Sequence, residues 1–200
     1  MPEVAGAATP SSARKRADAR RNEQALLDAA AAVFITHGVD APVRVIAAKA
    51  GVGISTIYRH FPTRADLVVA VYRHQVETLA GAAPRFLANV ETPSAALAQW
   101  MDRFVDFLVT KHGLAGALRS DYSGFDALHA YFLDRLVPAC ASLLNAAVEA
   151  GEIQRDVDAL TLMHGAGNLC IGVEAGGNTG YDAHRMVGLL IAGLRQSPSA

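Results

Sequence analysis

The chain has 200 residues, 52% of them hydrophobic, so it can bury a core without disulfides or a structural metal. Its only cysteines, Cys140 and Cys170, exclude a disulfide framework and favour two small apolar core residues. The formal net charge is −1, but residues 1–80 hold 10 Lys/Arg and 7 Asp/Glu, whereas residues 81–200 hold 8 and 12. A basic N-terminal part on an acidic remainder is typical of a protein that contacts phosphates at one end.

The N-terminal residues do not look like a secretory signal. Residues 1–20 are rich in Ala, Pro and Ser and then in basic residues, with no apolar segment behind the charges. The longest apolar stretch, residues 25–35, is interrupted by Asp28 and is too short to cross a bilayer. We therefore expect a cytoplasmic protein with no membrane partner.

Apolar residues recur at helical rather than strand spacing along the chain, which predicts an all-α fold of about nine helices. Residues 1–19 have no periodic apolar face and are predicted to be a disordered basic tail. Helices are expected over 20–37, 43–50, 54–61 and 64–83, and beyond Pro84 over 93–111, 114–119, 125–150, 157–172 and 181–195, with Gly38 and Gly151 as stops and Asp156 as an N-cap.

The segment 20–66 has the organisation of a helix-turn-helix domain. Two short helices are joined by the turn Gly51-Val52-Gly53 and follow a longer amphipathic helix. Val52 is expected to fill a small core, which leaves an outward face on the second short helix. That face is polar and carries an aromatic side chain, as entry into the major groove of DNA requires, and consists of Ser55, Thr56, Tyr58, Arg59 and His60.

The start of the next helix also indicates contact with an anion. Thr63 is the expected N-cap with Asp66 three residues later, and Arg64 places a cation where the helix dipole disfavours it. This unfavourable placement is explained if Arg64 and the helix N-terminus bind a phosphate.

Each of these assignments has an ordinary structural alternative. Tyr58 is either a phosphate contact or a half-buried core aromatic, and His60 is either a phosphate contact or a plain surface histidine. The basic residues of 14–21 form either a solvated tail or an arm that touches DNA.

Residues 22–75 resemble the TetR family of helix-turn-helix repressors. The stretch that carries the resemblance is IAAKAGVGISTIYRHFPTRADLVVAVY (46–72), with the family's turn at Ala50-Gly51-Val52, its Tyr-x-His-Phe ending at Tyr58–Phe61 and its basic residue at Arg64. Where members carry a capping box, this chain has Pro42 and Val45.

The resemblance implies an all-α homodimer that binds a palindromic double-stranded operator, is released by a small-molecule effector, and needs no cofactor. It implies a helix-turn-helix head (20–66) joined by a long fourth helix to a body (67–200) for ligand binding and dimerisation. The implied DNA contacts are Arg44, Ile54, Ser55, Thr56, Tyr58, His60 and Arg64, to which the polar face adds Arg59.

The body contains polar and aromatic residues suited to a small-molecule pocket, although aromatic residues at helical spacing are often plain core. The pocket candidates are Trp100, Phe104, Tyr122, Phe125, His129, His164 and Asn168. Small residues in the last two predicted helices permit close helix crossing, so Gly165, Gly172, Gly188 and Ala192 are candidates for a dimer interface.

Motifs of catalysis or metal binding are absent from the sequence. It has no His-Glu-x-x-His, P-loop or Gly-x-Ser-x-Gly motif, and no pair of histidines four residues apart. We expect neither an enzyme nor a metal protein. The rival hypothesis is an all-α ligand-binding or catalytic protein that does not read DNA, but such a protein would have no reason to keep the polar face that ends at Arg64.

Overall fold

The computed structural model describes residues 10–118, 125–154, 157–171 and 181–195, and for 10–13, 15–17, 109–118 and 125 only the helical backbone. Within this part of the chain the all-α prediction is confirmed, since an isolated bridge between Ile153 and Arg195 is the only β-type pairing. The helices are α1 (Pro10–His37), α2 (Val43–Ala50), α3 (Ile54–His60), α4 (Arg64–Ala80), α5 (Ala82–Asn89), α6 (Pro93–Leu118), α7 (Phe125–Glu149), α8 (Ala159–Leu169) and α9 (Ala183–Gly193).

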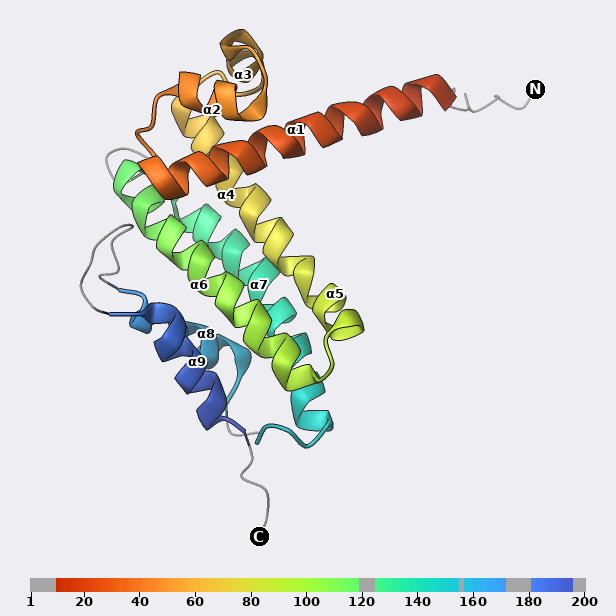
Figure 1. The fold of residues 1–200 in the computed structure, drawn as a ribbon, viewed down its shortest axis with the longest axis vertical. Coiled ribbons are helices and arrows are strands. Elements are labelled where there is room, and N and C mark those ends of the chain that lie inside the picture. Colours follow the sequence, from red (N-terminus) through yellow and green to blue (C-terminus); the bar gives the residue numbers. More distant parts are fainter. Residues whose placement is uncertain (1–9, 119–124, 155–156, 172–180, 196–200) are drawn as a thin grey trace.

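The helices are arranged as a small head at one end of a longer helical body (Figure 1). Helix α1 crosses the end of the body, and its N-terminal half projects beyond it, while α2 and α3 lie on the opposite side of α1. Helix α4 runs from the head into the body, where it contacts α6 and α7, and α8 and α9 pack against one flank. Helix α3 therefore lies in the head, well away from α5 on the body (Figure 1).

The predicted disorder of residues 1–19 is wrong for residues 10–19, because α1 begins at Pro10. The prediction relied on an apolar stripe, which this segment lacks, whereas Ala, Arg and Lys favour helix without one. Proline is tolerated in a first turn because its missing N–H would have no partner there. Residues 1–9 lie outside the described part of the chain.

Three predicted helix boundaries in the body are also wrong. Helix α4 ends at Ala80, and a separate helix, α5, carries Pro84 in its first turn, where proline is acceptable. The helices predicted over 93–111 and 114–119 are one helix, α6, so Gly113 does not break it. The N-cap of α8 is Asp158 rather than Asp156, and its side chain accepts a hydrogen bond from the Thr161 N–H at 2.9 Å.

One hydrophobic core runs from the head through the body, so the two parts share buried side chains. Trp100 is fully buried and donates from its indole nitrogen to the Leu79 carbonyl oxygen at 2.9 Å. Cys140 and Cys170 are both buried free thiols, as predicted, and burial raises the pKa of Cys140 to about 12. None of the described helices is long and apolar enough to span a membrane.

Candidate nucleic-acid interface and ligand pocket

The turn between α2 and α3 is held by backbone geometry that glycine permits. Gly51 adopts a left-handed conformation (φ 67°, ψ 29°) as the C-cap of α2, and the Val52 N–H donates to the Ala47 carbonyl oxygen at 3.0 Å. Gly53 is the extended N-cap of α3 and has no side chain to cap it. As a result, α3 begins immediately after the turn with its first residues exposed.

The polar face of α3 points away from the protein. Ile57 is 1% exposed and fixes the inner side of the helix in the core, whereas Tyr58 is 49% and Ile54 45% exposed. Ser55, Arg59 and His60 are exposed as well, and Thr56 is half-buried. The alternative that Tyr58 is a core aromatic is therefore excluded.

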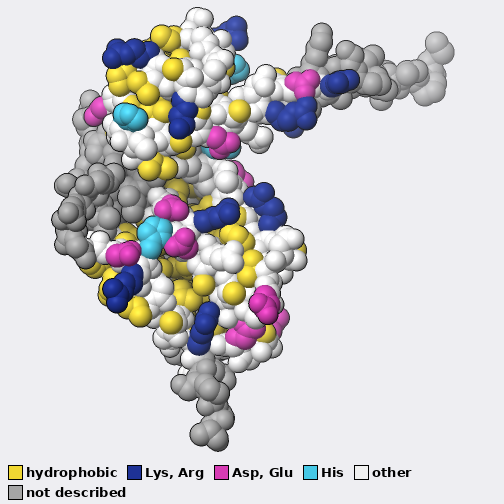
Figure 2. Space-filling view, in the orientation of Figure 1, with side chains coloured by type: hydrophobic (Ala, Val, Ile, Leu, Met, Phe, Trp, Pro, Cys, Tyr) yellow, Lys and Arg dark blue, Asp and Glu magenta, His cyan; other side chains and the backbone are white. Residues whose placement is uncertain are grey.

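The exposed residues of α3 lie on two sides of the helix. Thr56, Arg59 and His60 line a groove whose opposite wall includes Asn22 and Glu23 of α1. Ile54, Ser55 and Tyr58 do not line that groove and form the outer side of the helix. Figure 2 shows Lys, Arg and His side chains over the head and along the projecting part of α1, while most acidic side chains lie on the body.

Helix α2 begins without a side-chain cap. Pro42 is itself the N-cap (φ −59°, ψ 137°), because its fixed φ suits the extended cap position. Arg44, the second residue of the helix, is exposed. Its side chain is therefore accessible at the same end of the molecule as α3.

Arg64 was predicted to bind a phosphate, but its side chain is engaged in contacts within the head. Its guanidinium donates to the Val39 carbonyl oxygen and to the Ala41 carbonyl oxygen, the latter at 2.7 Å, and lies 5.9 Å from the centre of the Phe34 ring. The predicted cap is present: Thr63 and Asp66 form a reciprocal capping box, whose hydrogen bonds lower the pKa of Asp66. Arg64 thus fastens the loop between α1 and α2 to the start of α4.

The basic residues of α1 lie on a helix rather than on a flexible arm. Arg14, Arg20 and Arg21 are exposed, and Arg21 pairs with Asp18 one turn earlier. An exposed pair of this kind contributes little stability. These arginines therefore remain accessible to a partner.

Several predicted ligand residues meet at one cavity between α6, α7 and α8. Phe104, His129, His164 and Asn168 line a cavity of about 130 Å³ together with Leu108, Phe132, Leu133, Leu160, Met163 and Gly167. The Phe104 and Phe132 rings are stacked at 6.1 Å, and His129 is stacked on Phe132 at 5.8 Å. No Asp, Glu, Lys or Arg is among these lining residues.

The other predicted pocket residues are not part of this cavity. Trp100 is a core residue because its only polar group is already bound to Leu79, so its assignment to the pocket is wrong. Tyr122 lies outside the described residues, and Phe125 is described only as the first helical residue of α7. Leu160 was missed in the sequence, since nothing distinguishes it there from an ordinary core residue.

Comparison with known proteins gives two matches that together cover most of the chain. Residues 26–71 match the model of bacterial regulatory proteins of the tetR family, and residues 92–196, more than half of the chain, match that of the C-terminal domain of SbtR-like transcriptional regulators. The crystal structure of a TetR transcriptional regulator from Streptomyces coelicolor is 33% identical, with a TM-score of 0.77 over 88% of this chain and 99% of that one. The chain belongs to the TetR family.

Other members of the TetR family are similar over a short segment or over most of the chain. A TetR regulatory protein from Mycobacterium vanbaalenii is 32% identical, with a TM-score of 0.71 over 90% of this chain and 99% of that one. The HTH-type transcriptional repressor LfrR of Mycolicibacterium smegmatis is 48% identical over 63 residues, a match that spans only 32% of each chain. The structure of LfrR from Mycobacterium smegmatis in complex with proflavine has a TM-score of 0.61, with 27% identity over 88% of this chain and 96% of that one.

The predicted dimer residues of this TetR-family chain do not all lie on one exposed surface. Gly188 and Ala192 of α9 are exposed, next to Leu189, which is 59% exposed. Gly165 of α8 is only half-buried, and a Cβ there would lie 3.6 Å from the Leu190 side chain of the same subunit. Gly165 therefore permits packing of α8 against α9, and its place in a dimer interface stays a prediction. Gly172 lies outside the described residues.

Helix α4 of the TetR-family fold is tied to both the head and the body by polar contacts that the sequence did not reveal. His74 bonds through Nε2 to Asp28 of α1 at 2.7 Å. Glu77 accepts two hydrogen bonds from Arg135 of α7, at 2.7 and 2.8 Å, and one from the Tyr131 hydroxyl at 2.5 Å. These bonds lower the pKa of Glu77. The partners are 46 to 58 residues apart in sequence, which is why no local pattern indicates them.

His184 links α9 to α6. Its Nδ1 lies 2.5 Å from Asp102 and its Nε2 lies 3.2 Å from Asp106. Partial burial by itself disfavours the charged imidazole, but the hydrogen bond to Asp102 and the charges of Asp102, Asp106 and Asp182 outweigh it, so the pKa of His184 is raised from 6.5.

Replacing His184 by Asn should therefore remove a pH-dependent part of the stability. A raised pKa in the folded state stabilises the fold fully below the unfolded value of 6.5, and this contribution is lost as pH rises through the folded pKa. Because the imidazole is 40% exposed, we expect less than about 1 kcal/mol. Urea unfolding of wild type and H184N from pH 5 to 9 should show the difference shrinking as pH rises. A difference that grows with pH would contradict the assignment, and D102N should weaken the same dependence.

Proposed function

We propose that this chain is a ligand-responsive repressor that binds a palindromic operator in the bacterial cytoplasm as a homodimer. The single observation that carries the proposal is the exposed polar face of α3. This helix directly follows the Gly51–Gly53 turn, and Ile57 is its one buried residue. A face of this kind suits the major groove, where side chains can reach base edges. The repressor LfrR, which is 48% identical over 63 residues, supports the direction of regulation.

The DNA contacts follow from where the side chains lie. Residues on the outer side of α3 would reach bases or the near phosphates, and residues of the groove side would reach the phosphates of the other strand. We assign DNA contact to Arg44, Ile54, Ser55, Thr56, Tyr58, Arg59 and His60. Arg64 is left out, because its guanidinium is occupied by carbonyl oxygens of the head.

The effector would occupy the cavity between α6, α7 and α8. Stacked rings of Phe104 and Phe132 favour a flat aromatic molecule, and His129, His164 and Asn168 supply hydrogen-bonding groups. Since no formally charged side chain is among the described residues that line the cavity, we propose an uncharged ligand. The structure of LfrR with proflavine supports binding of a small molecule by this kind of body.

Dimerisation would bury exposed apolar side chains of the last two helices. Leu189, Met186 and Leu160 are 59%, 36% and 38% exposed, and two residues that flank α8 and α9, Ile171 and Tyr181, are 68% and 42% exposed. The exposed small residues Gly188 and Ala192 would allow two copies of α9 to approach closely. This arrangement would hold two heads at a fixed spacing, as a palindromic operator requires.

Helix α4 would transmit the effect of the ligand. It is bonded to α1 of the head through His74 and to α7 of the body through Glu77, so a shift of α7 around a bound ligand would move the head. The two heads would then no longer match the spacing of the operator. Linkage requires that operator DNA weaken effector binding by the same factor.

Selection of bound fragments from random duplex DNA, followed by titration of the selected site at two salt concentrations, tests the proposal. A repressor of this kind should select a palindrome and should lose affinity steeply as salt rises, because phosphate contacts release counterions. The rival hypothesis, a helical ligand-binding protein that does not read DNA, predicts no enriched sequence. No enrichment at any salt concentration would therefore refute the proposed function.

A further inference from the structure

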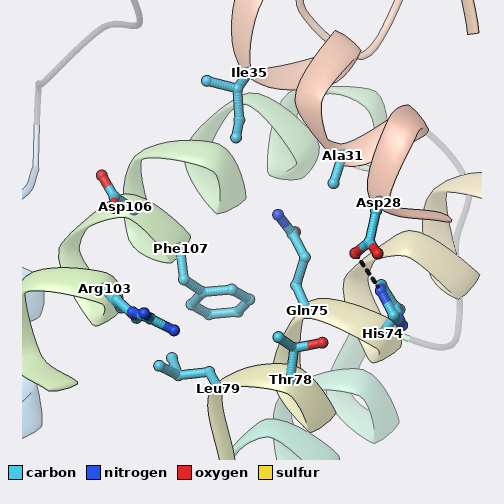
Figure 3. A pocket seen from close by; sticks show the side chains of 10 residues that line it. All are labelled: Asp28, Ala31, Ile35, His74, Gln75, Thr78, Leu79, Arg103, Asp106 and Phe107. Atoms are coloured by element: carbon cyan, nitrogen blue, oxygen red, sulfur yellow. Dashed lines mark hydrogen bonds and ion pairs between the residues drawn. The ribbon is translucent and has the colours of Figure 1, made fainter. Parts of the chain in front are cut away.

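A second cavity lies where the head meets the body, between α1, α4 and α6 (Figure 3). Its volume is about 240 Å³, larger than the cavity between α6, α7 and α8. Its apolar lining is Ala31 and Ile35 from the head and Leu79 and Phe107 from the body. A molecule bound here would touch both parts of the protein at once.

Gln75 supplies an unused hydrogen-bond acceptor in this cavity. Its side chain extends from α4 into the space between Ala31 and Phe107. The Gln75 Oε1 atom is buried and has no hydrogen-bond partner among the described residues. A buried acceptor without a partner is costly, so a ligand that donates one hydrogen bond here would gain more than it would at the surface.

The charged side chains at the rim already have partners within the protein. Asp28 is bonded to His74, and Asp106 lies 3.2 Å from His184. The Arg103 guanidinium lies 4.7 Å from the centre of the Phe86 ring. The charged groups at the rim therefore do not favour a charged ligand, and the combination of an apolar lining with one acceptor favours a neutral molecule.

We propose that this cavity is a second ligand site, specific for a small neutral aromatic compound with one O–H or N–H donor directed at Gln75. A phenol meets this description. The ligand packs its ring against Phe107 and Ala31 and thereby fixes the position of α1 relative to α4 and α6. Any effect of this ligand on DNA binding rests on the proposed function, whereas the binding of the ligand to the cavity does not.

The test uses the full chain with p-cresol as the probe and 4-methylanisole, which keeps the ring but lacks the donor, as the matched probe. Binding is followed by NMR shifts of the Ala31 methyl group and the Gln75 side-chain amide. We expect p-cresol to bind more tightly than 4-methylanisole, and Q75M to lower p-cresol affinity about five- to tenfold, the value of one hydrogen bond. The affinity for 4-methylanisole should be the same in wild type and Q75M.

Two filled-cavity variants locate the site. A31L should abolish p-cresol binding, whereas G167L, which fills the other cavity, should leave it unchanged. At Gly167 no atom lies within 4 Å of an added Cβ, so the control variant has room to fold. Circular dichroism of each variant checks the fold.

Equal p-cresol affinity in wild type and Q75M, or loss of binding in G167L alone, would overturn the proposal. So would the absence of any p-cresol-induced shift at the Ala31 methyl group and the Gln75 amide. Failure of the chain to bind DNA would refute the proposed function and leave this site standing. Operator binding by a chain that does not bind p-cresol would refute this ligand site and leave the proposed function standing.

Discussion

Replacing Arg59 by Ala should weaken operator binding about 30- to 150-fold while leaving the fold intact. The side chain is exposed on the groove side of α3, beside the two most exposed large side chains of that helix. A charge-assisted contact to DNA contributes roughly 1–1.5 kcal/mol, and the loss is counted twice in a symmetric dimer. Fluorescence anisotropy with the selected operator, at several salt concentrations, measures the effect.

The salt dependence separates a phosphate contact from a base contact at Arg59. If the guanidinium binds a phosphate, the slope of log affinity against log salt should fall by about one per subunit, and affinity should drop equally for all sequences. R85A is the matched control, because Arg85 is an exposed arginine of α5, which lies on the body away from α3. Equal operator affinity in wild type and R59A would remove Arg59 from the interface.

Replacing Arg64 by Ala should lower the free energy of unfolding by about 2–4 kcal/mol. Hydrogen bonds from a charged donor to carbonyl oxygens contribute roughly 1.5–3 kcal/mol, and the contact with Phe34 adds about 0.5–1 kcal/mol. The carbonyl groups of the buried residues Val39 and Ala41 lose their Arg64 partner in R64A, and the loop between α1 and α2 is released from α4. Urea unfolding followed by circular dichroism measures the loss.

Arg59 is the matched control for Arg64, since both are arginines of the head. R59A should change the free energy of unfolding by less than about 0.5 kcal/mol, as expected for an exposed side chain that has no hydrogen bond or ion pair among the described residues. R64K should lie between wild type and R64A, because a lysine reaches one carbonyl but lacks the planar fork of arginine. If R64A has normal stability but binds DNA more weakly, the phosphate contact predicted for Arg64 from the sequence is supported instead.

The head could be read largely from the sequence because its signals are local. The spacing of Gly51 and Gly53, the apolar positions around Ile57 and the Thr63–Asp66 capping box all lie within a few residues of the helix ends they specify. The exposure of α3 follows from the same periodicity. The helical start of α1 at Pro10 was missed because helix propensity, rather than an apolar stripe, favours helix there.

The body could be predicted as helical, but its sites could not be fully assigned. Phe104, His129, His164 and Asn168 come together as expected, yet Trp100 belongs to the core. Periodicity tells which side of a helix is apolar. It does not tell whether that side meets a cavity, a neighbouring helix or a second subunit.

By itself, then, the sequence determined the all-α fold, the turn before α3 and the polar edge of that helix, because hydrophobic period, glycine conformation and capping act over a few residues. Only the tertiary structure decided the partners of Arg64, the contacts of α4 through His74 and Glu77, and the cavity around Gln75. These depend on side chains that are more than twenty residues apart in the chain. Their distances are set by how whole helices pack, which no local pattern encodes.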